Sequence, residues 1–395
     1  MRSNDFTWRH SLAATLFLLS PFDLLASLGM DMYLPVVPLM AGALDTSAIT
    51  IQWTLTAYLV LLGAGQLVFG PLSDRLGRRP VLLGGGLAYI AASSGLAIAS
   101  SPGVFLGLRI LQACGAAACL VATFATVRDI YSGRQESRVI YGLLGSMLAM
   151  VPAAGPLLGA LLSAWLGWRA IFGALAIAMG GAVIAAWLLW PETRQRTAND
   201  PQWSQFLLPL RRRDFWLYTL CYSAGMGSFF VFFSTAPWLM MGRQQLSQLG
   251  FSLLFATVAI AMMAAARLMG RLISRWGNLK TLRLGMGGLI AGAAILAAAE
   301  LLAPHSPLGL IAPMWLVGAS IATAVSVAPN GALQGLDHIA GTATAVYFCL
   351  GGLILGGIGT LAVMLLPGGT SWPIIAYALS LATAVMCLSG TARRD

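Results

Sequence analysis

Charged side chains are scarce in this sequence. Only 9% of its 395 residues are Asp, Glu, Lys or Arg, while 58% are hydrophobic and the mean hydropathy is +0.81. Soluble globular domains carry about 25% charged residues, and a chain with so few of them would expose large apolar patches to water. The composition therefore excludes an ordinary soluble domain and predicts a chain that lies in a lipid bilayer.

Clusters that bind metals, nucleic acids or nucleotides are also lacking. The five cysteines lie inside apolar stretches, and His10, His305 and His338 fall in expected tails or loops, so neither residue type has metal-site or disulfide spacing. The formal net charge is +10, but the positive residues punctuate apolar runs instead of forming one basic surface, which argues against nucleic-acid binding. No nucleophile–base constellation or phosphate-cradling loop is present. We therefore expect no enzyme, no catalytic residues, no metal and no cofactor.

Long apolar runs predict the membrane spans. About 20 residues are needed to cross ~30 Å of hydrocarbon, and charges or turn signals divide the chain into twelve such runs. The first run carries Asp23 and Asp31 and lacks a clear cleavage site, so we interpret it as an uncleaved helix instead of a signal peptide. The expected spans are residues 11–38, 50–70, 80–99, 103–127, 139–162, 169–190, 215–238, 249–270, 281–302, 308–329, 341–366 and 372–391.

Basic residues are distributed unequally between the two sides of these spans. The side that holds both chain ends has 20 of the 23 basic residues, the opposite side has Arg169 and Arg243, and Arg109 lies within a helix. Positive charge accumulates on the cytoplasmic side of membrane proteins. We therefore expect both termini in the cytoplasm.

The polar interval from Pro191 to Arg213 divides the chain almost in half, and a short repeat supports that division. Residues 70–77 (Gly-Pro-Leu-Ser-Asp-Arg-Leu-Gly) and 270–277 (Gly-Arg-Leu-Ile-Ser-Arg-Trp-Gly) share Gly, Leu, Arg and Gly in register. Each copy falls between the second and third spans of its half, as in duplicated secondary transporters. We expect a six-helix bundle at 1–190, a cytoplasmic linker at 191–213 and a second six-helix bundle at 214–395.

Four stretches resemble motifs of one family. Residues 70–79 resemble the signature loop of the major facilitator superfamily, and 109–115 resemble its fourth-helix motif. Residues 145–159 resemble the fifth-helix motif of drug/proton antiporters, and 28–38 the first-helix pattern of twelve-helix drug exporters. The resemblance implies an all-α membrane protein with the major facilitator fold, working as a monomer that exchanges a small-molecule drug for protons.

Residues 20–27, 124–131 and 222–230 resemble bacterial chloramphenicol exporters more specifically. This resemblance implies proton-driven efflux of chloramphenicol, and of related phenicols, across the bacterial inner membrane, with drug resistance as the result. Composition and spacing say nothing of the drug, so a multidrug or other amphipathic-solute exporter of the same family is the alternative. Importers share the fold, and the motif at 145–159 is what favours antiport.

Three ionisable residues fall inside predicted spans, where the cost of a buried charge makes a function the first hypothesis. Asp31 and Arg109 are expected at similar depths, with Asp23 ~12 Å deeper on nearly the same helix face. One interpretation is a permanent Asp31–Arg109 ion pair that pins two helices. We favour the other, in which Asp31 carries a proton beside Arg109. Asp23 shares that role, contacts the drug or is an interfacial polar residue.

The signature loop implies a cytoplasmic gate. Asp74 is expected to face the amino-terminal end of the eleventh helix near Gly341, where the helix dipole is positive. Ser274 replaces Asp74 in the second copy, so the gate role is confined to the first copy. The candidate gate residues are Gly70, Asp74, Arg75, Gly77, Arg78 and Asp129, with Arg75, Arg78 and Asp129 as ion-pair partners.

The fifth-helix motif is expected to act through helix shape, because proline kinks a helix and glycine lets a neighbour approach closely. Its residues are Gly145, Pro152, Gly155, Pro156 and Gly159. Aromatic and amide side chains are candidates for lining the drug cavity, although packing or a lipid-facing position is the stronger alternative for any single aromatic. These candidates are Tyr33, Tyr58, Gln66, Phe229, Phe233, Asn330 and Tyr347.

Overall fold

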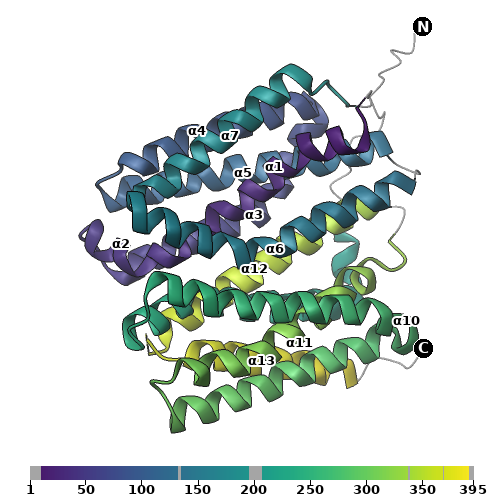
Figure 1. Cartoon of the computed structure of the whole chain (residues 1–395). Helices are drawn as coiled ribbons and strands as arrows, with labels where there is room; N and C mark the ends of the chain where they lie inside the picture. Colours follow the sequence, from purple (N-terminus) through teal and green to yellow (C-terminus); the bar gives the residue numbers. More distant parts are fainter. Residues whose placement is uncertain (1–9, 132–134, 195–206, 337–338, 368, 391–395) are drawn as a thin grey trace, which may run out of the picture. The chain divides into compact units, whose positions relative to one another are not determined.

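The computed structural model describes residues 10–131, 135–194, 207–336, 339–367 and 369–390, and these are almost entirely helical (Figure 1). The helices, in chain order, are α1 (Leu12–Asp31), η1 (Leu34–Val36), α2 (Val37–Ala43), α3 (Ala48–Leu76), α4 (Arg78–Ile98), α5 (Pro102–Tyr131), α6 (Gln135–Leu166), α7 (Arg169–Leu189), η2 (Pro209–Arg211), α9 (Arg213–Pro237), η3 (Trp238–Arg243, a π-helix), α10 (Gln248–Leu302), α11 (Pro307–Leu333), α12 (Ala340–Leu365) and α13 (Trp372–Gly390).

Twelve segments of the described chain are long and apolar enough to cross a membrane, and they coincide with the twelve predicted spans. The first of them is interrupted, contrary to the single helix expected at 11–38: α1 ends at Asp31, and the chain continues through a short 3₁₀ turn into α2. Pro35 explains the break, because it has no N–H to donate to the carbonyl of Asp31 and its ring disfavours helical geometry at the residue before it.

The repeat found in the sequence has a structural counterpart. Gly77 ends α3 and begins α4 with a φ of 111°, and Gly277 interrupts α10 with a φ of 74°. Both values lie in the left-handed region, which glycine enters without the steric cost that a Cβ brings. In each copy of the repeat, the last glycine therefore separates two successive spans.

The chain separates into two compact units. The first comprises Met1–Tyr33, Ala43–Thr46 and Trp53–Asp200, and the second comprises Leu34–Gly42, Ser47–Gln52 and Pro201–Asp395. The second unit thus takes in two short segments from the early part of the chain. The assignment of residues 1–190, 191–213 and 214–395 to two bundles and a linker stays a prediction.

Small residues bring helices together in both units. In the first, α4 and α5 meet where Gly85 and Gly115 face each other: a Cβ on Gly115 would lie 2.6 Å from the carbonyl oxygen of Gly85. In the second, Gly285 of α10 meets Ala324 of α11 in the same manner. Such contacts are how helices pack without a hydrophobic driving force, and here they hold α5, which carries Arg109.

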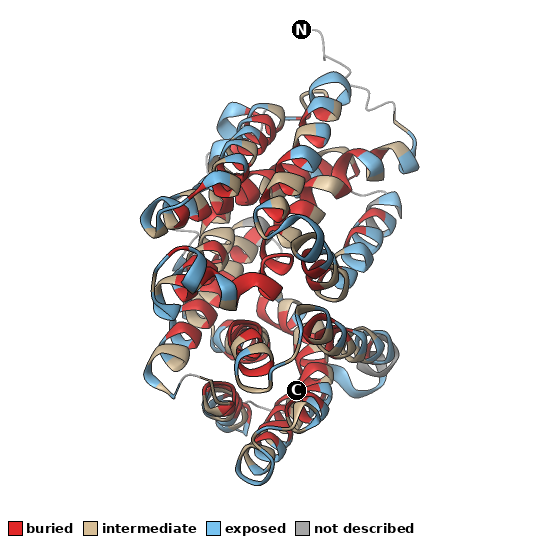
Figure 2. Ribbon diagram, turned by 60° about the vertical axis from the view of Figure 1, so that its left-hand side comes forward, coloured by how far each residue is buried: buried red, intermediate tan, exposed pale blue. Residues whose placement is uncertain are grey.

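Most helices carry buried residues along one side and exposed residues along the other (Figure 2). The exposed sides are apolar: Ile98, Ile177 and Leu302 are each about four-fifths exposed. Apolar surface of this extent on long apolar helices is the surface that lipid covers. The chain is therefore a multi-pass membrane protein.

Candidate transport site

Arg109 is fully buried on α5 in the first unit. Its Nη1 donates to the carbonyl oxygen of Gly29 at 2.8 Å and to Oε1 of Gln112 at 2.6 Å. The guanidinium carbon lies 4.4 Å from the ring centroid of Tyr58 and 4.9 Å from that of Tyr33. A cation held over two aromatic faces is stabilised without a carboxylate partner.

The end of α1 explains why Arg109 binds Gly29. The N–H of Tyr33 donates to the carbonyl of Met30, so it does not continue the helical pattern to Gly29. The Gly29 carbonyl belongs to the last turn of α1, where carbonyls lack helical partners and the helix dipole is negative. The guanidinium supplies both the missing donor and the complementary charge.

Asp31 is the last residue of α1 and is 7% exposed. Its Cβ packs against Gly155 of α6, and the backbone of Met32 packs still more tightly against Gly159. The Asp31 carboxylate makes no ion pair or hydrogen bond within the described chain, so the permanent Asp31–Arg109 ion pair is absent from this conformation. Arg109 nevertheless binds a carbonyl two residues before Asp31, which places the two residues near the same turn of α1.

Arg109 also retains unused hydrogen-bonding capacity, since its Nε and Nη2 are buried without a partner in the described chain. Unsatisfied donors on a buried charge are costly. A carboxyl without a partner and a guanidinium with free donors, near one turn of helix, form an arrangement that can exchange a proton. Asp23 is also buried, at 2% exposure, and makes no ion pair in the described residues.

The gate candidates form a network at the α3–α4 junction. Arg78 Nη1 lies 2.5 Å from Asp74 Oδ1, and Arg78 Nε lies 2.7 Å from Asp129 Oδ2. Arg128, which was not predicted, lies 3.8 Å from an oxygen of each carboxylate. Arg75 is exposed and takes no part in the ion pairs of the described chain, so its predicted pairing is wrong for this conformation. The expected approach of Asp74 to Gly341 stays a prediction.

Glu192 completes this junction and was missed by the sequence reasoning. Its two carboxylate oxygens accept the backbone N–H groups of Arg78 at 2.9 Å and Arg79 at 3.2 Å. These are first-turn donors of α4 that lack helical partners. A Cβ on Gly77 would collide with the Glu192 carboxylate, so Gly77 serves the contact as well as the turn. The position of Glu192 directly after the sixth apolar run was the available signal.

The fifth-helix motif lies on α6 and divides into two parts. Gly155 and Gly159 are the residues against which Asp31 and Met32 pack, and Pro152 and Pro156 lie within the same helix. A Cβ on Gly145 or on the gate residue Gly70 would meet nothing within 4 Å. Close packing thus explains Gly155 and Gly159 alone.

The cavity candidates are placed very differently from one another. Tyr33 and Tyr58 are fully buried against Arg109, which makes them part of its surroundings and not an open lining. Gln66 is half-buried on α3, and Asn330 is exposed on α11. Phe229 and Phe233 pack around Phe255 of α10 at ring-centroid distances of 6.2 and 6.0 Å.

Tyr347 belongs to an aromatic cluster between α12 and α9. Its ring centroid lies 5.2 Å from that of Tyr222 and 6.5 Å from that of Phe215. The side chain is fully buried, and its hydroxyl has no hydrogen-bond partner in the described chain. Phe255 and Tyr222, which organise these two clusters, were not singled out because any aromatic in an apolar helix has the same sequence pattern.

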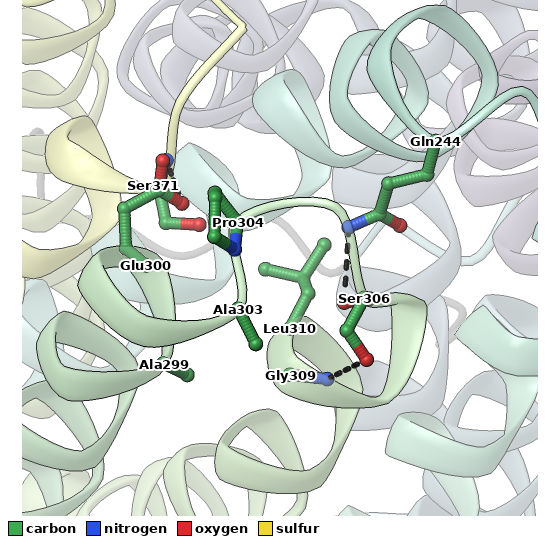
Figure 3. Close-up of a pocket in the computed structure, with 9 residues that line it drawn as sticks. All are labelled: Gln244, Ala299, Glu300, Ala303, Pro304, Ser306, Gly309, Leu310 and Ser371. Carbon is green, nitrogen blue, oxygen red and sulfur yellow. Dashed lines mark hydrogen bonds between the residues drawn. The ribbon is translucent and has the colours of Figure 1, made fainter.

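A small cavity lies where the ends of α10 and α11 meet the turn before α13 (Figure 3). Glu300 borders it and pairs with Arg243 at 2.6 Å, while its other oxygen accepts the Ser371 N–H at 3.2 Å. Gln244 donates to the carbonyl of Ser306 across the same space. The cavity has room for about one water molecule, so it is too small to hold a drug.

Comparison with known proteins agrees with this architecture. The family model of the Major Facilitator Superfamily matches residues 22–360. The chain belongs to the major facilitator superfamily. It is therefore a membrane transporter of small molecules, and its helices have the arrangement that the signature loop predicted.

Individual relatives narrow the comparison. The chain is 71% identical over 393 residues to a "Chloramphenicol resistance protein" of Pseudomonas aeruginosa, which covers all of this chain and 94% of the relative. It is 35% identical over 170 residues to "Multidrug resistance protein MdtL" of Escherichia coli O81 (strain ED1a), covering 42% of this chain and 43% of that protein. The crystal structure of a POT family transporter in complex with 5-aminolevulinic acid has a TM-score of 0.74 at 12% identity, covering 95% of this chain and 94% of that one. This last likeness shows the fold alone.

Proposed function

We propose that this protein expels chloramphenicol from the bacterial cytoplasm in exchange for protons and thereby confers drug resistance. The 71% identity along the full chain to a chloramphenicol resistance protein carries the proposal. The match runs along the whole chain, so it covers both units. Related phenicols share the same recognition chemistry and belong to the proposed substrate range.

Proton exchange is assigned to Asp31, with Arg109 as its partner and Asp23 in a supporting role. Chloramphenicol is neutral, so it cannot displace a proton by charge. We infer that drug and proton compete in one of two ways. Either the drug forms hydrogen bonds to the carboxyl or the guanidinium, or it excludes the proton sterically. The free donors of Arg109 support this coupling, because either a ligand oxygen or an ionised Asp31 can accept a hydrogen bond from them.

The proposal also covers sidedness and gating. The excess of basic residues at the chain ends supports cytoplasmic termini in the inner membrane. The Asp74–Arg78–Asp129 ion pairs support a gate at the cytoplasmic side, since they link the α3–α4 junction to the end of α5. We propose a monomer that needs no cofactor beyond the proton gradient.

The experiment is uptake of labelled chloramphenicol by energised cells that express the protein. Accumulation is expected to fall below that of cells with empty vector and to recover when an uncoupler collapses the proton gradient. A matched strain that expresses Asp31→Asn at equal membrane levels is the control for background efflux. Accumulation that the protein does not change at all contradicts chloramphenicol as substrate.

A multidrug exporter is the second candidate, favoured by the similarity to MdtL over 170 residues. The same cells distinguish the two functions if they are challenged with chemically unrelated amphipathic drugs. Resistance restricted to phenicols supports the first function. Resistance of similar strength to several unrelated drugs supports the second.

A further inference from the structure

Two tyrosines hold α1 by hydrogen bonds to its backbone. The Tyr89 hydroxyl on α4 donates to the carbonyl of Leu25 at 2.8 Å, and the Tyr58 hydroxyl on α3 donates to the carbonyl of Ala26 at 2.6 Å. Both side chains are fully buried. A helical carbonyl accepts one N–H from within the helix and has a second lone pair available, so these bonds add to the helix without disrupting it.

Gly29 is what allows the hydroxyls to reach these carbonyls. In an α-helix the side chain at position i+4 lies on the same face as position i, so a Cβ at residue 29 covers the carbonyl of Leu25. A Cβ on Gly29 would lie 2.5 Å from the Tyr89 hydroxyl and 2.7 Å from the Tyr58 hydroxyl. Any larger residue there would push both hydroxyls away from α1.

The same turn of helix carries the proposed coupling residues. The carbonyl of Gly29 accepts the hydrogen bond from Arg109, and Asp31 follows two residues later. Three helices, α3, α4 and α5, therefore each donate a side-chain hydrogen bond to residues 25–29. We name this set of donors, Tyr58, Tyr89 and Arg109, the carbonyl clasp. Gly29 is the residue that leaves space for it.

We propose that Tyr58 and Tyr89 are positioning residues for proton exchange, which fix the distance between Asp31 and Arg109 by holding α1 in place. This inference rests on the proposed role of Asp31. The clasp explains how a carboxyl and a guanidinium that do not bond each other stay at a set separation. Neither tyrosine touches the drug or carries the proton in this proposal.

The other residues around Asp31 do not fix its separation from Arg109. Helix α6 presents Gly155 and Gly159, which bring no charge or donor side chain. Helix α7 contributes Phe172, which packs against Tyr33 at a ring-centroid distance of 5.8 Å. Among the described residues, the charged or titratable groups near this turn are Arg109, Tyr58, Tyr33 and Tyr89, with the buried Cys119 close to the two hydrogen-bonding tyrosines.

The second unit offers a matched control. The Tyr377 hydroxyl of α13 donates to the carbonyl of Ser223 on α9 at 2.9 Å, and a Cβ on Gly227, four residues later, would run into the Tyr377 ring. The hydrogen bond, the burial and the glycine at i+4 are the same. Residues 215–237 carry no charge. Tyr377→Phe thus removes an equivalent bond away from the coupling residues.

The test measures proton occupancy of Asp31 directly. Full-length wild-type, Tyr89→Phe, Tyr58→Phe/Tyr89→Phe and Tyr377→Phe proteins in liposomes are treated with dicyclohexylcarbodiimide, which reacts with protonated carboxyls, across a range of pH. Mass spectrometry gives the modified fraction of Asp31. In the double variant the pH of half-maximal modification is expected to move by at least about half a unit, a threefold change in proton affinity, and in Tyr377→Phe it is expected to stay at the wild-type value.

Three results overturn the inference: an Asp31 that does not react at any pH, a double variant that titrates like wild type, or a Tyr377→Phe variant that shifts as far as the double variant. If the double variant does not fold, Tyr89→Phe alone decides by the same criterion. Exchange of labelled chloramphenicol at equal pH on both sides is measured in the same liposomes. Absence of exchange in wild type contradicts the proposed substrate, while the Asp31 titration still decides the role of the tyrosines.

Discussion

Helices α1 and α9 are the first long helices of the two units, and their buried polar groups are satisfied in different ways. In α9 the hydroxyls of Thr219, Ser223 and Ser228 each donate to the carbonyl four residues earlier in the same helix. In α1 the donors come from three other helices, and two carboxyls remain unpaired within the described chain. Hydroxyls that bond within their own helix place no constraint on a neighbouring helix. Helix α9 receives a tyrosine bond from Tyr377, whereas donors from three helices fix the position of residues 25–29 of α1. The comparison shows that several helices hold the end of α1 through its backbone, whereas the buried hydroxyls of α9 bond mainly within their own helix.

The largest expected effect is the loss of export when Asp31 is replaced. Asp31→Asn keeps the size of the side chain but cannot carry a proton, so proton-driven chloramphenicol export should fall about 100-fold, the scale of losing an acid–base group. Resistance of cells and uptake at equal membrane expression measure it. Asn in place of Asp214 on α9, which lies in the first turn, is expected to change export little. Full activity of Asp31→Asn removes Asp31 as the carrier.

The next largest effect is a loss of stability when the close packing of α6 against the end of α1 is disturbed. Gly159→Leu would force a side chain into the backbone of Met32, which no rotamer change relieves, and overpacking of this kind costs about 1–3 kcal/mol. Thermal unfolding in detergent checks it. Gly145→Leu is the matched control on the same helix, where a Cβ meets nothing within 4 Å. Equal losses at the two positions would show that α6 is not held against α1.

The two repeat glycines sharpen the comparison further. Gly77→Ala and Gly277→Ala both place a Cβ at a left-handed φ, at a cost of about 1–2 kcal/mol. Gly77→Ala also displaces the Glu192 carboxylate, while a Cβ on Gly277 meets open space. Gly77→Ala should therefore lower the unfolding midpoint more than Gly277→Ala does. A larger loss at Gly277 would contradict the role given to Glu192.

The smallest effects are expected from two tyrosines of the second unit. Tyr377→Phe removes a hydrogen bond to α9 and should cost about 1 kcal/mol. Tyr347→Phe removes a buried hydroxyl that has no partner in the described chain, so the change should be neutral or stabilising by up to about 1 kcal/mol. Thermal unfolding curves of the two variants, recorded in parallel with wild type, measure both changes in stability. A loss at Tyr347 that exceeds the loss at Tyr377 would show that its hydroxyl has a partner in the native membrane.

The sequence predicted the spans because charge is nearly absent from them, and this holds for the second unit as well as the first. It also predicted that Asp31 and Arg109 lie buried within spans and that Arg78 and Asp129 form ion pairs, since charges stand out in an apolar chain. The coupling role given to Asp31 and Arg109 stays a prediction. The sequence did not reveal the break after Asp31. Pro35 signals it only when its missing N–H is matched to a particular carbonyl.

Contacts from side chains to backbone were the least predictable. The Tyr89–Leu25 bond joins residues 64 positions apart, and a backbone carbonyl has no residue type to mark it. Glu192 is similar, because the groups that donate to its carboxylate are backbone N–H groups. Gly29 was the one available signal for the clasp, as glycine within a helix implies a close neighbour. The identity of that neighbour required the structure.

Proton movement driven by the drug itself tests the coupling most directly. Liposomes with a pH-sensitive dye inside receive an outward chloramphenicol gradient at equal starting pH, with wild-type protein or Asp31→Asn. Wild type is predicted to carry protons inward as drug leaves, so the lumen acidifies, while Asp31→Asn leaves the lumen pH constant. Drug efflux through wild type without acidification, or acidification that persists in Asp31→Asn, would contradict proton exchange at Asp31.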